Sequence, residues 1–131
     1  MSRTSRIAAT RSNLMRARRL RDAGRTGEAI VEFETSIRYR PNEADAYVEL
    51  GGYLISLGRQ AEAIRLFQTA LEVEPGNTMA MGLLTLNAIA TGNEAEANEW
   101  MTKVRNQPRM PRNQLSQLQA AYSQQFGKSP P

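Results

Sequence analysis

The chain lacks cysteine and histidine altogether. These absences exclude disulfides, thiol chemistry, and sites in which imidazole acts as a base or binds a metal. No apolar run approaches the roughly 20 residues that span a bilayer, and the N-terminus has no apolar stretch of the secretory type. We therefore expect a soluble, cytoplasmic protein that is not an enzyme and that uses no cofactor or metal.

Acidic residues are almost missing from the first 27 residues, which hold eight arginines and one acid, Asp22. This end carries a formal charge of +7, and the rest of the chain carries −3. Such asymmetry fits an anionic partner (an acidic protein face, nucleic acid or lipid headgroups), or a solvated end that keeps the protein soluble. No aromatic residue precedes Phe33, so side chains that stack on bases are missing from the basic end. Binding to nucleic acid or a membrane surface is therefore the less favoured alternative.

An internal repeat is the most informative positive feature of the sequence. Gly24, Gly58 and Gly92 lie 34 residues apart, and each is followed four and five positions later by Glu-Ala. A fixed period of this length is typical of stacked helical hairpins, each of which buries its apolar face against its neighbours.

The middle repeat, residues 44–77, shows the pattern most clearly and predicts two antiparallel helices over residues 44–57 and 61–74. Tyr47, Leu50 and Leu54 recur three and four residues apart, so they share one face of the first helix. Gly58 follows that helix, where a left-handed cap favours glycine. Pro75 ends the second helix because a proline pushes the preceding residue out of the helical region.

This repeat resembles the tetratricopeptide repeat, whose pattern has a large residue, Leu-Gly, an aromatic residue, Ala-x3-Phe and a proline. The corresponding positions, of which seven match, are Tyr47, Leu50, Gly51, Leu54, Ala63, Phe67, Ala70 and Pro75. Leu54 departs from the pattern because it replaces the aromatic residue. The resemblance implies an all-α fold, a right-handed α-solenoid of three helix-turn-helix units with a C-terminal capping helix.

The period divides the chain into a basic N-terminal extension (1–9), a repeat domain (10–126) and a flexible tail (127–131). The domain contains repeats at 10–43, 44–77 and 78–111 and a capping helix at 112–126. In the first repeat, Asn13 and Arg16 occupy the positions of Tyr47 and Leu50, which gives the polar outer face that a terminal repeat needs. The acid-free start also permits an organelle-targeting segment, although its arginines continue directly into the first repeat helix.

The family's groove-facing positions, carried onto this chain, form a surface that changes from basic through mixed to apolar. They are Arg11, Met15, Arg18, Arg21, Asp45, Val48, Glu49, Ile55, Met79, Leu83, Leu86 and Ile89. The resemblance implies an adaptor or scaffold that binds a peptide or helix of another protein there, with self-association also possible. The capping helix could cover part of the apolar stretch, and the sequence leaves that question open.

Overall fold

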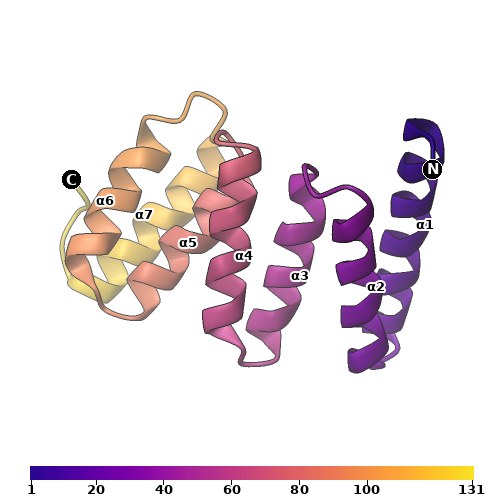
Figure 1. The fold of residues 1–131 in the computed structure, drawn as a ribbon. Coiled ribbons are helices and arrows are strands. Elements are labelled where there is room, and N and C mark those ends of the chain that lie inside the picture. Colours follow the sequence, from indigo (N-terminus) through magenta and orange to yellow (C-terminus); the bar gives the residue numbers. More distant parts are fainter. The chain divides into compact units, whose positions relative to one another are not determined.

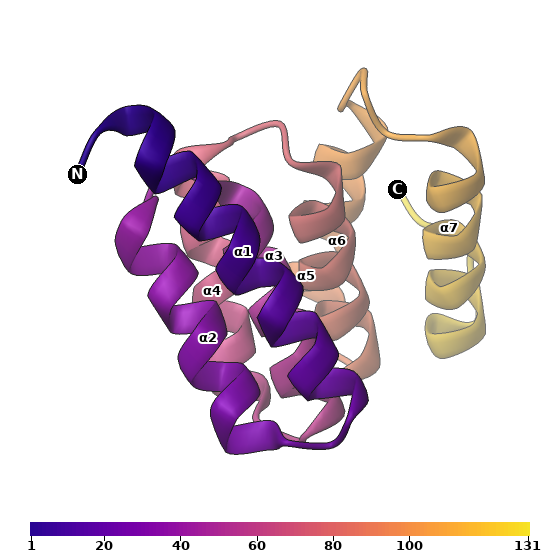
Figure 2. The ribbon, with the colours of Figure 1, turned by 90° about the vertical axis from the view of Figure 1, so that its right-hand side faces the viewer.

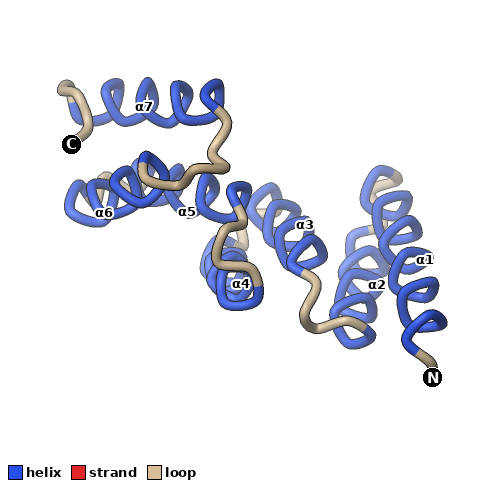
Figure 3. The backbone as a smooth tube through the Cα atoms, turned by 90° about the horizontal axis from the view of Figure 1, so that it is seen from above, coloured by secondary structure: helices blue, strands red, loops and turns tan.

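A computed structural model describes residues 1–131 and contains helices and loops only (Figure 3). The seven helices are α1 (Arg3–Asp22), α2 (Thr26–Tyr39), α3 (Ala44–Ser56), α4 (Gln60–Val73), α5 (Thr78–Ala90), α6 (Glu94–Arg105) and α7 (Arg112–Phe126). They form two compact units, Met1–Val73 with α1 to α4 and Glu74–Pro131 with α5 to α7. None of the helices has the length and apolarity of a bilayer span. The all-helical fold predicted from the repeat is confirmed.

Each hairpin turns at one of the three repeated glycines. Gly24, Gly58 and Gly92 have φ angles of +75°, +78° and +75°, in the region where a β-carbon is disfavoured. The amide of Arg25 donates to the Leu20 carbonyl and that of Arg59 to the Leu54 carbonyl, both at 2.8 Å. The same backbone geometry therefore closes successive hairpins, as the 34-residue spacing predicts.

Unit 1 consists of two hairpins, α1–α2 and α3–α4, with α2 packed against α3 (Figures 1 and 2). Large and small side chains alternate in its core, and Phe33 and Phe67 are both fully buried. Gly51 of α3 faces the second of these rings so closely that a β-carbon there would lie 2.5 Å from Phe67 Cε1. Close approach of α3 and α4 thus depends on the absence of a side chain at Gly51.

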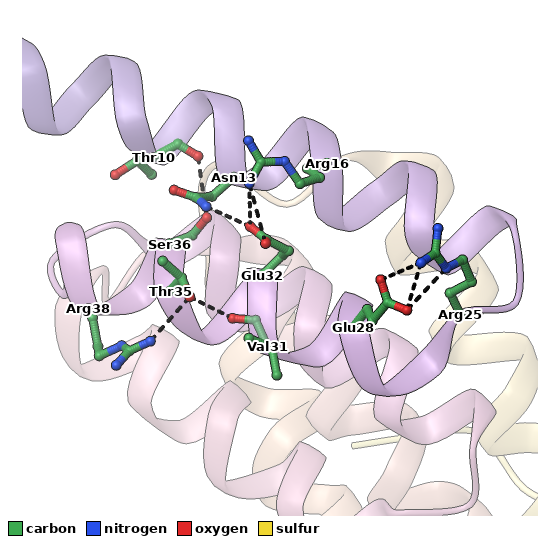
Figure 4. A network of polar contacts seen from close by, with 10 residues as sticks. All are labelled: Thr10, Asn13, Arg16, Arg25, Glu28, Val31, Glu32, Thr35, Ser36 and Arg38. Atoms are coloured by element: carbon green, nitrogen blue, oxygen red, sulfur yellow. Dashed lines mark hydrogen bonds and ion pairs between the residues drawn. The ribbon is translucent and has the colours of Figure 1, made fainter.

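The outer face of the first hairpin is closed by polar contacts (Figure 4). Asn13 Nδ2 donates to Glu32 Oε2 at 2.6 Å, and Arg16 forms an ion pair with the same carboxylate at 3.4 Å. In the middle repeat, the equivalent positions hold Tyr47, Leu50 and Leu66. At the polar positions that the sequence predicts, Asn13 and Arg16 therefore share one carboxylate, that of Glu32.

The first helix begins within the predicted N-terminal extension, residues 1–9. Ser2 is its N-cap, with Oγ accepting from the Ser5 amide at 3.1 Å, so residues 3–9 belong to α1. Thr10 lies within this helix and is itself buried, and its carbonyl accepts from the fully buried Ser36 hydroxyl at 3.3 Å (Figure 4). The expected boundary between an extension and the domain thus falls inside a continuous helix, because capping residues and alanines extend it toward the N-terminus.

Unit 2 consists of the α5–α6 hairpin and α7, which packs against both helices. Its core includes Met101, Leu118 and Tyr122, each no more than 2% exposed, and the Tyr122 hydroxyl donates to Asn98 Oδ1. The bounds of α7 coincide with the range over which the apolar spacing predicts a helix. After Gly127, the expected flexible tail contacts α6, through a Lys128–Glu94 ion pair and a hydrogen bond from Arg105 to the Pro131 carbonyl.

Candidate functional site

In unit 1, two of the predicted groove residues, Arg18 and Glu49, neutralise each other. Arg18 of α1 holds Glu49 of α3 with two hydrogen bonds, Nε to Oε1 at 2.7 Å and Nη2 to Oε2 at 2.8 Å. These hydrogen bonds and the nearby carboxylates of Glu49 and Asp45 raise the pKa of Arg18 above its ordinary value, although partial burial opposes the shift. Both charges therefore have a partner within the unit.

A cleft of about 320 Å³ lies beside this pair and brings together three of the predicted residues, Arg11, Arg18 and Asp45. Its remaining lining residues are Ile7, Thr10, Leu14, Arg40 and Glu43. Arg40 and Glu43 form a further ion pair at 3.0 Å, whereas Arg11 is exposed and has no acidic partner. The cleft is therefore strongly polar, with one free guanidinium.

The other predicted residues of unit 1 do not gather in that cleft. Met15 is 49% exposed, and Arg21 forms an ion pair with the neighbouring Asp22 at 3.2 Å. Val48 and Ile55 of α3 are partly buried. Only Met15 among them offers a sizeable apolar surface to solvent.

In unit 2, three predicted residues line one wall of a groove of about 350 Å³ between α5 and α7. Met79, Leu83 and Leu86 belong to α5, and the exposed fractions of Met79 and Leu86 are 55% and 43%. The other lining residues are Gly82, Pro111, Asn113, Gln114, Gln117 and Leu118. No charged residue lines this groove, so its chemistry is apolar on one side and rich in carboxamides on the other.

Gln114 belongs to the groove wall that carries the carboxamides, and it is held in place by a hydrogen bond to α5. Its Nε2 donates to the Thr78 carbonyl at 3.2 Å, and a β-carbon at Gly82 would lie only 2.3 Å from that nitrogen. Asn113 and Gln117 are exposed and make no hydrogen bond within the protein. The groove therefore presents two unengaged carboxamides next to exposed apolar side chains.

Ile89 corrects the sequence prediction, since it is 4% exposed and cannot line an accessible groove. The α5 helix packs against both α6 and α7, and seven of its thirteen residues are buried. Other helices therefore cover two faces of α5, whereas the groove positions carried over from the family assume that only one face is covered. The open question about α7 is thereby answered: it covers part of the apolar stretch and leaves Met79 and Leu86 exposed.

A larger cleft in unit 1 escaped the sequence analysis. Its volume is about 570 Å³, and it lies between α2 and α4 with α3 as its floor. Its apolar wall residues include Ile30, Ile37 and Leu66, all partly buried. The apolar spacing along α2 and α4 is visible in the sequence, but such spacing predicts contacts between neighbouring helices as readily as it predicts an open cleft.

The basic N-terminal end is only half neutralised. Four of its arginines form ion pairs, Arg16 with Glu32, Arg18 with Glu49, Arg21 with Asp22 and Arg25 with Glu28. The other four have no acidic partner within 4 Å; they are Arg3, Arg6, Arg11 and Arg19. No group of three or more acidic side chains is placed to hold a metal ion.

Comparison with known proteins identifies the repeat. No curated protein matches the chain at a significant level. The sequence model of the tetratricopeptide repeat matches residues 14–79, about half of the chain, from α1 to the start of α5. Repeats of this kind are typically non-enzymatic and generally mediate protein–protein interactions. This match agrees with the repeated turn glycines and the helical hairpins, and the chain belongs to the tetratricopeptide repeat family.

Proposed function

We propose that this protein is an adaptor that binds a segment of a partner protein in the groove between α5 and α7. The exposed apolar wall of that groove is the observation that carries the proposal. Met79 and Leu86 are about half exposed, and burying the remainder of each would contribute roughly 1 kcal/mol. Met79, Leu83 and Leu86 lie on one face of α5 and line the same groove, and apolar side chains gathered in this way, unlike singly exposed ones, favour an interaction site.

The absence of charge in the groove sets the expected character of the interaction. Association through apolar contacts loses little affinity in salt, whereas ion pairs exposed to solvent are screened. In unit 1, by contrast, the predicted groove charges Arg18 and Glu49 are engaged with each other. Partner binding should therefore depend on α5 and persist at high ionic strength.

Capture from native lysate by the immobilised full chain tests this proposal. Met79→Glu and Leu86→Glu place a charge in the groove, while Val31→Glu and Leu57→Glu place one on α2 and at the end of α3, where the exposed fractions are 55% and 39%. We expect specific proteins to be retained by the wild type and by both control variants at low and high salt, and to be lost with both groove variants. Equal retention by groove and control variants would refute the proposal.

A second candidate function is binding to an anionic surface through α1. The four arginines without an acidic partner favour it, because each could replace a counterion on phosphate. It ranks second because the other four are already paired. Binding to anionic vesicles or to an oligonucleotide should then fall steeply with salt and weaken in Arg11→Ala/Arg19→Ala; a flat salt response would eliminate this candidate.

A further inference from the structure

We propose that the cleft between α2 and α4 is a second protein-binding surface, and that it takes an amphipathic helix whose apolar stripe is flanked by acidic residues. The cleft is formed by the second helices of two successive repeats, whereas the groove positions of the family lie on the first helices. All of its lining residues belong to unit 1, so the proposal does not depend on the function of the α5–α7 groove.

The shape of the cleft matches one side of a helix. The α2 and α4 helices run in the same direction, and each packs against α3, which forms the floor between them (Figures 1 and 3). The α2 wall extends from Ile30 to Arg38 and the α4 wall from Glu62 to Thr69, which are lengths of about 12 Å and about 10 Å along the helix axes. Two turns of a partner helix cover this length and present apolar residues at i, i+3 or i+4, and i+7.

Apolar side chains on both walls provide contacts for such a stripe. Ile30 and Ile37 of α2 and Leu66 of α4 are partly buried and line the cleft, whose volume is about 570 Å³. The floor residues are at most 8% exposed; they are Tyr47, Leu50 and Leu54. Because the floor is closed, side chains inserted from a partner cover the remaining apolar surface of the walls and leave water themselves.

The charges at the rims set the composition of the partner. Arg59 holds Glu62 with two hydrogen bonds of 2.8 and 2.7 Å, and these bonds, with a weaker attraction from Glu34, raise the pKa of Arg59. Arg38 on the α2 rim and Arg65 on the α4 rim are exposed and have no acidic partner within 4 Å. One unpaired guanidinium on each rim favours a partner with a carboxylate on each side of its apolar stripe.

The uncharged polar side chains of the cleft favour a helix over an extended segment. Two of them line the cleft, and both are engaged. The Thr69 hydroxyl donates to the Arg65 carbonyl at 3.0 Å, and the Tyr47 hydroxyl donates to a loop carbonyl, that of Pro41, at 2.7 Å. An extended segment would bring unpaired backbone groups against these walls, whereas a helix pairs its backbone groups internally.

Selection of helical peptides on the full-length protein tests the proposal. The probe is a displayed library of stapled, alanine-based helices in which one face is randomised. We expect the selected peptides to carry apolar residues at three- and four-residue spacing, with Asp or Glu on both sides of the stripe. A selected peptide labelled with fluorescein is then titrated with the protein by fluorescence anisotropy.

Charge reversals at the rims locate the peptide in the cleft. Arg38→Glu and Arg65→Glu should each weaken binding about fivefold at low salt, near the upper limit for an exposed ion pair, and the loss should shrink at high salt. Arg19→Glu makes the same change in net charge on the exposed surface of α1 and should leave the affinity unchanged. Replacing the facing Glu of the peptide by Lys should restore binding to Arg65→Glu and weaken binding to the wild type.

Two adjacent residues of α2 provide a matched apolar pair. Ile30 lines the cleft, whereas Val31 is 55% exposed and lies outside it. Ile30→Ala should weaken peptide binding about fivefold, and Val31→Ala should not change it. Far-ultraviolet circular dichroism checks that both variants keep their helical structure.

Several results would overturn the proposal: no selected helix, the same loss in Arg19→Glu as in Arg65→Glu, or unchanged affinity in Ile30→Ala. Self-association of the wild type in sedimentation velocity that the peptide reverses would also overturn it, because the cleft would then hold a second copy of the chain. The peptide should bind Met79→Glu as tightly as the wild type. Failure of this proposal is therefore distinguishable from failure of the proposed function, which depends on α5.

Discussion

Replacing Gly51 and Gly52 by alanine, one at a time, measures the close approach of α3 and α4. Both glycines lie inside α3, so either replacement should gain about 1 kcal/mol from the higher helix propensity of alanine. A β-carbon at Gly52 would meet nothing within 4 Å. Gly52→Ala should therefore stabilise the protein by about that amount.

Gly51→Ala should behave differently, because its β-carbon would lie 2.5 Å from Phe67 Cε1 and 3.0 Å from two further ring atoms. The ring is fully buried and cannot turn away into solvent. Overpacking of this kind costs about 1–3 kcal/mol. Since the propensity gain is common to both variants, the difference in their free energies of unfolding isolates the packing cost.

Denaturant unfolding followed by far-ultraviolet circular dichroism provides the measurement. We expect Gly51→Ala to be less stable than Gly52→Ala by about 1–3 kcal/mol. The deficit should shrink when Phe67→Leu is added, since a double-mutant cycle reports coupling between residues in contact. Equal stabilisation by the two alanines would show that Gly51 does not set the distance between the helices.

Two further predictions concern Tyr47 and the polar outer face. Burial raises the pKa of the Tyr47 phenol, so the folded state holds the phenolic proton more tightly than the unfolded state does. The contribution of this proton to stability should be complete below pH about 10 and should be lost as the pH rises through the folded pKa. In denaturant unfolding at a series of alkaline pH values, Tyr47→Phe should flatten this decline, and an unchanged decline would contradict the assignment. Copying the middle repeat with the triple variant Asn13→Tyr, Arg16→Leu and Glu32→Leu should expose an apolar face and cause concentration-dependent self-association in sedimentation velocity. Sedimentation identical to that of the wild type would refute this expectation.

The sequence predicts the fold closely because the determinants of each hairpin are local. The predicted helix limits at 44–57 and 61–74 differ by one residue at most from Ala44–Ser56 and Gln60–Val73. Turn glycines and apolar spacing act within a few residues and can be seen directly. The 34-residue period sets the boundary at residue 10 but does not show where the first helix begins; a capping serine and helix-favouring residues extend α1 back to Arg3.

The candidate site was less predictable because it depends on contacts between helices distant in the sequence. The apolar residues Met79, Leu83 and Leu86 follow from their repeat positions, and they do line a groove. The spacing of α5 could not show that α7 would bury Gly82 beneath Gln114 or that Ile89 would be covered. The place of Asn113 and Gln117 in the groove lining could not be predicted for the same reason, since polar residues on a terminal helix usually indicate only a solvated face.

The turn geometry at Gly24, Gly58 and Gly92 also bears on how the chain reaches its native state. Each hairpin brings together residues that are near in sequence, so the loop-closure entropy opposing its formation is small. Proteins dominated by such short-range pairings acquire structure rapidly, and in repeat proteins nucleation can occur in any one hairpin and propagate to its neighbours. Three equivalent starting points give this chain parallel folding routes, so a mutation that slows one turn leaves the others able to initiate folding.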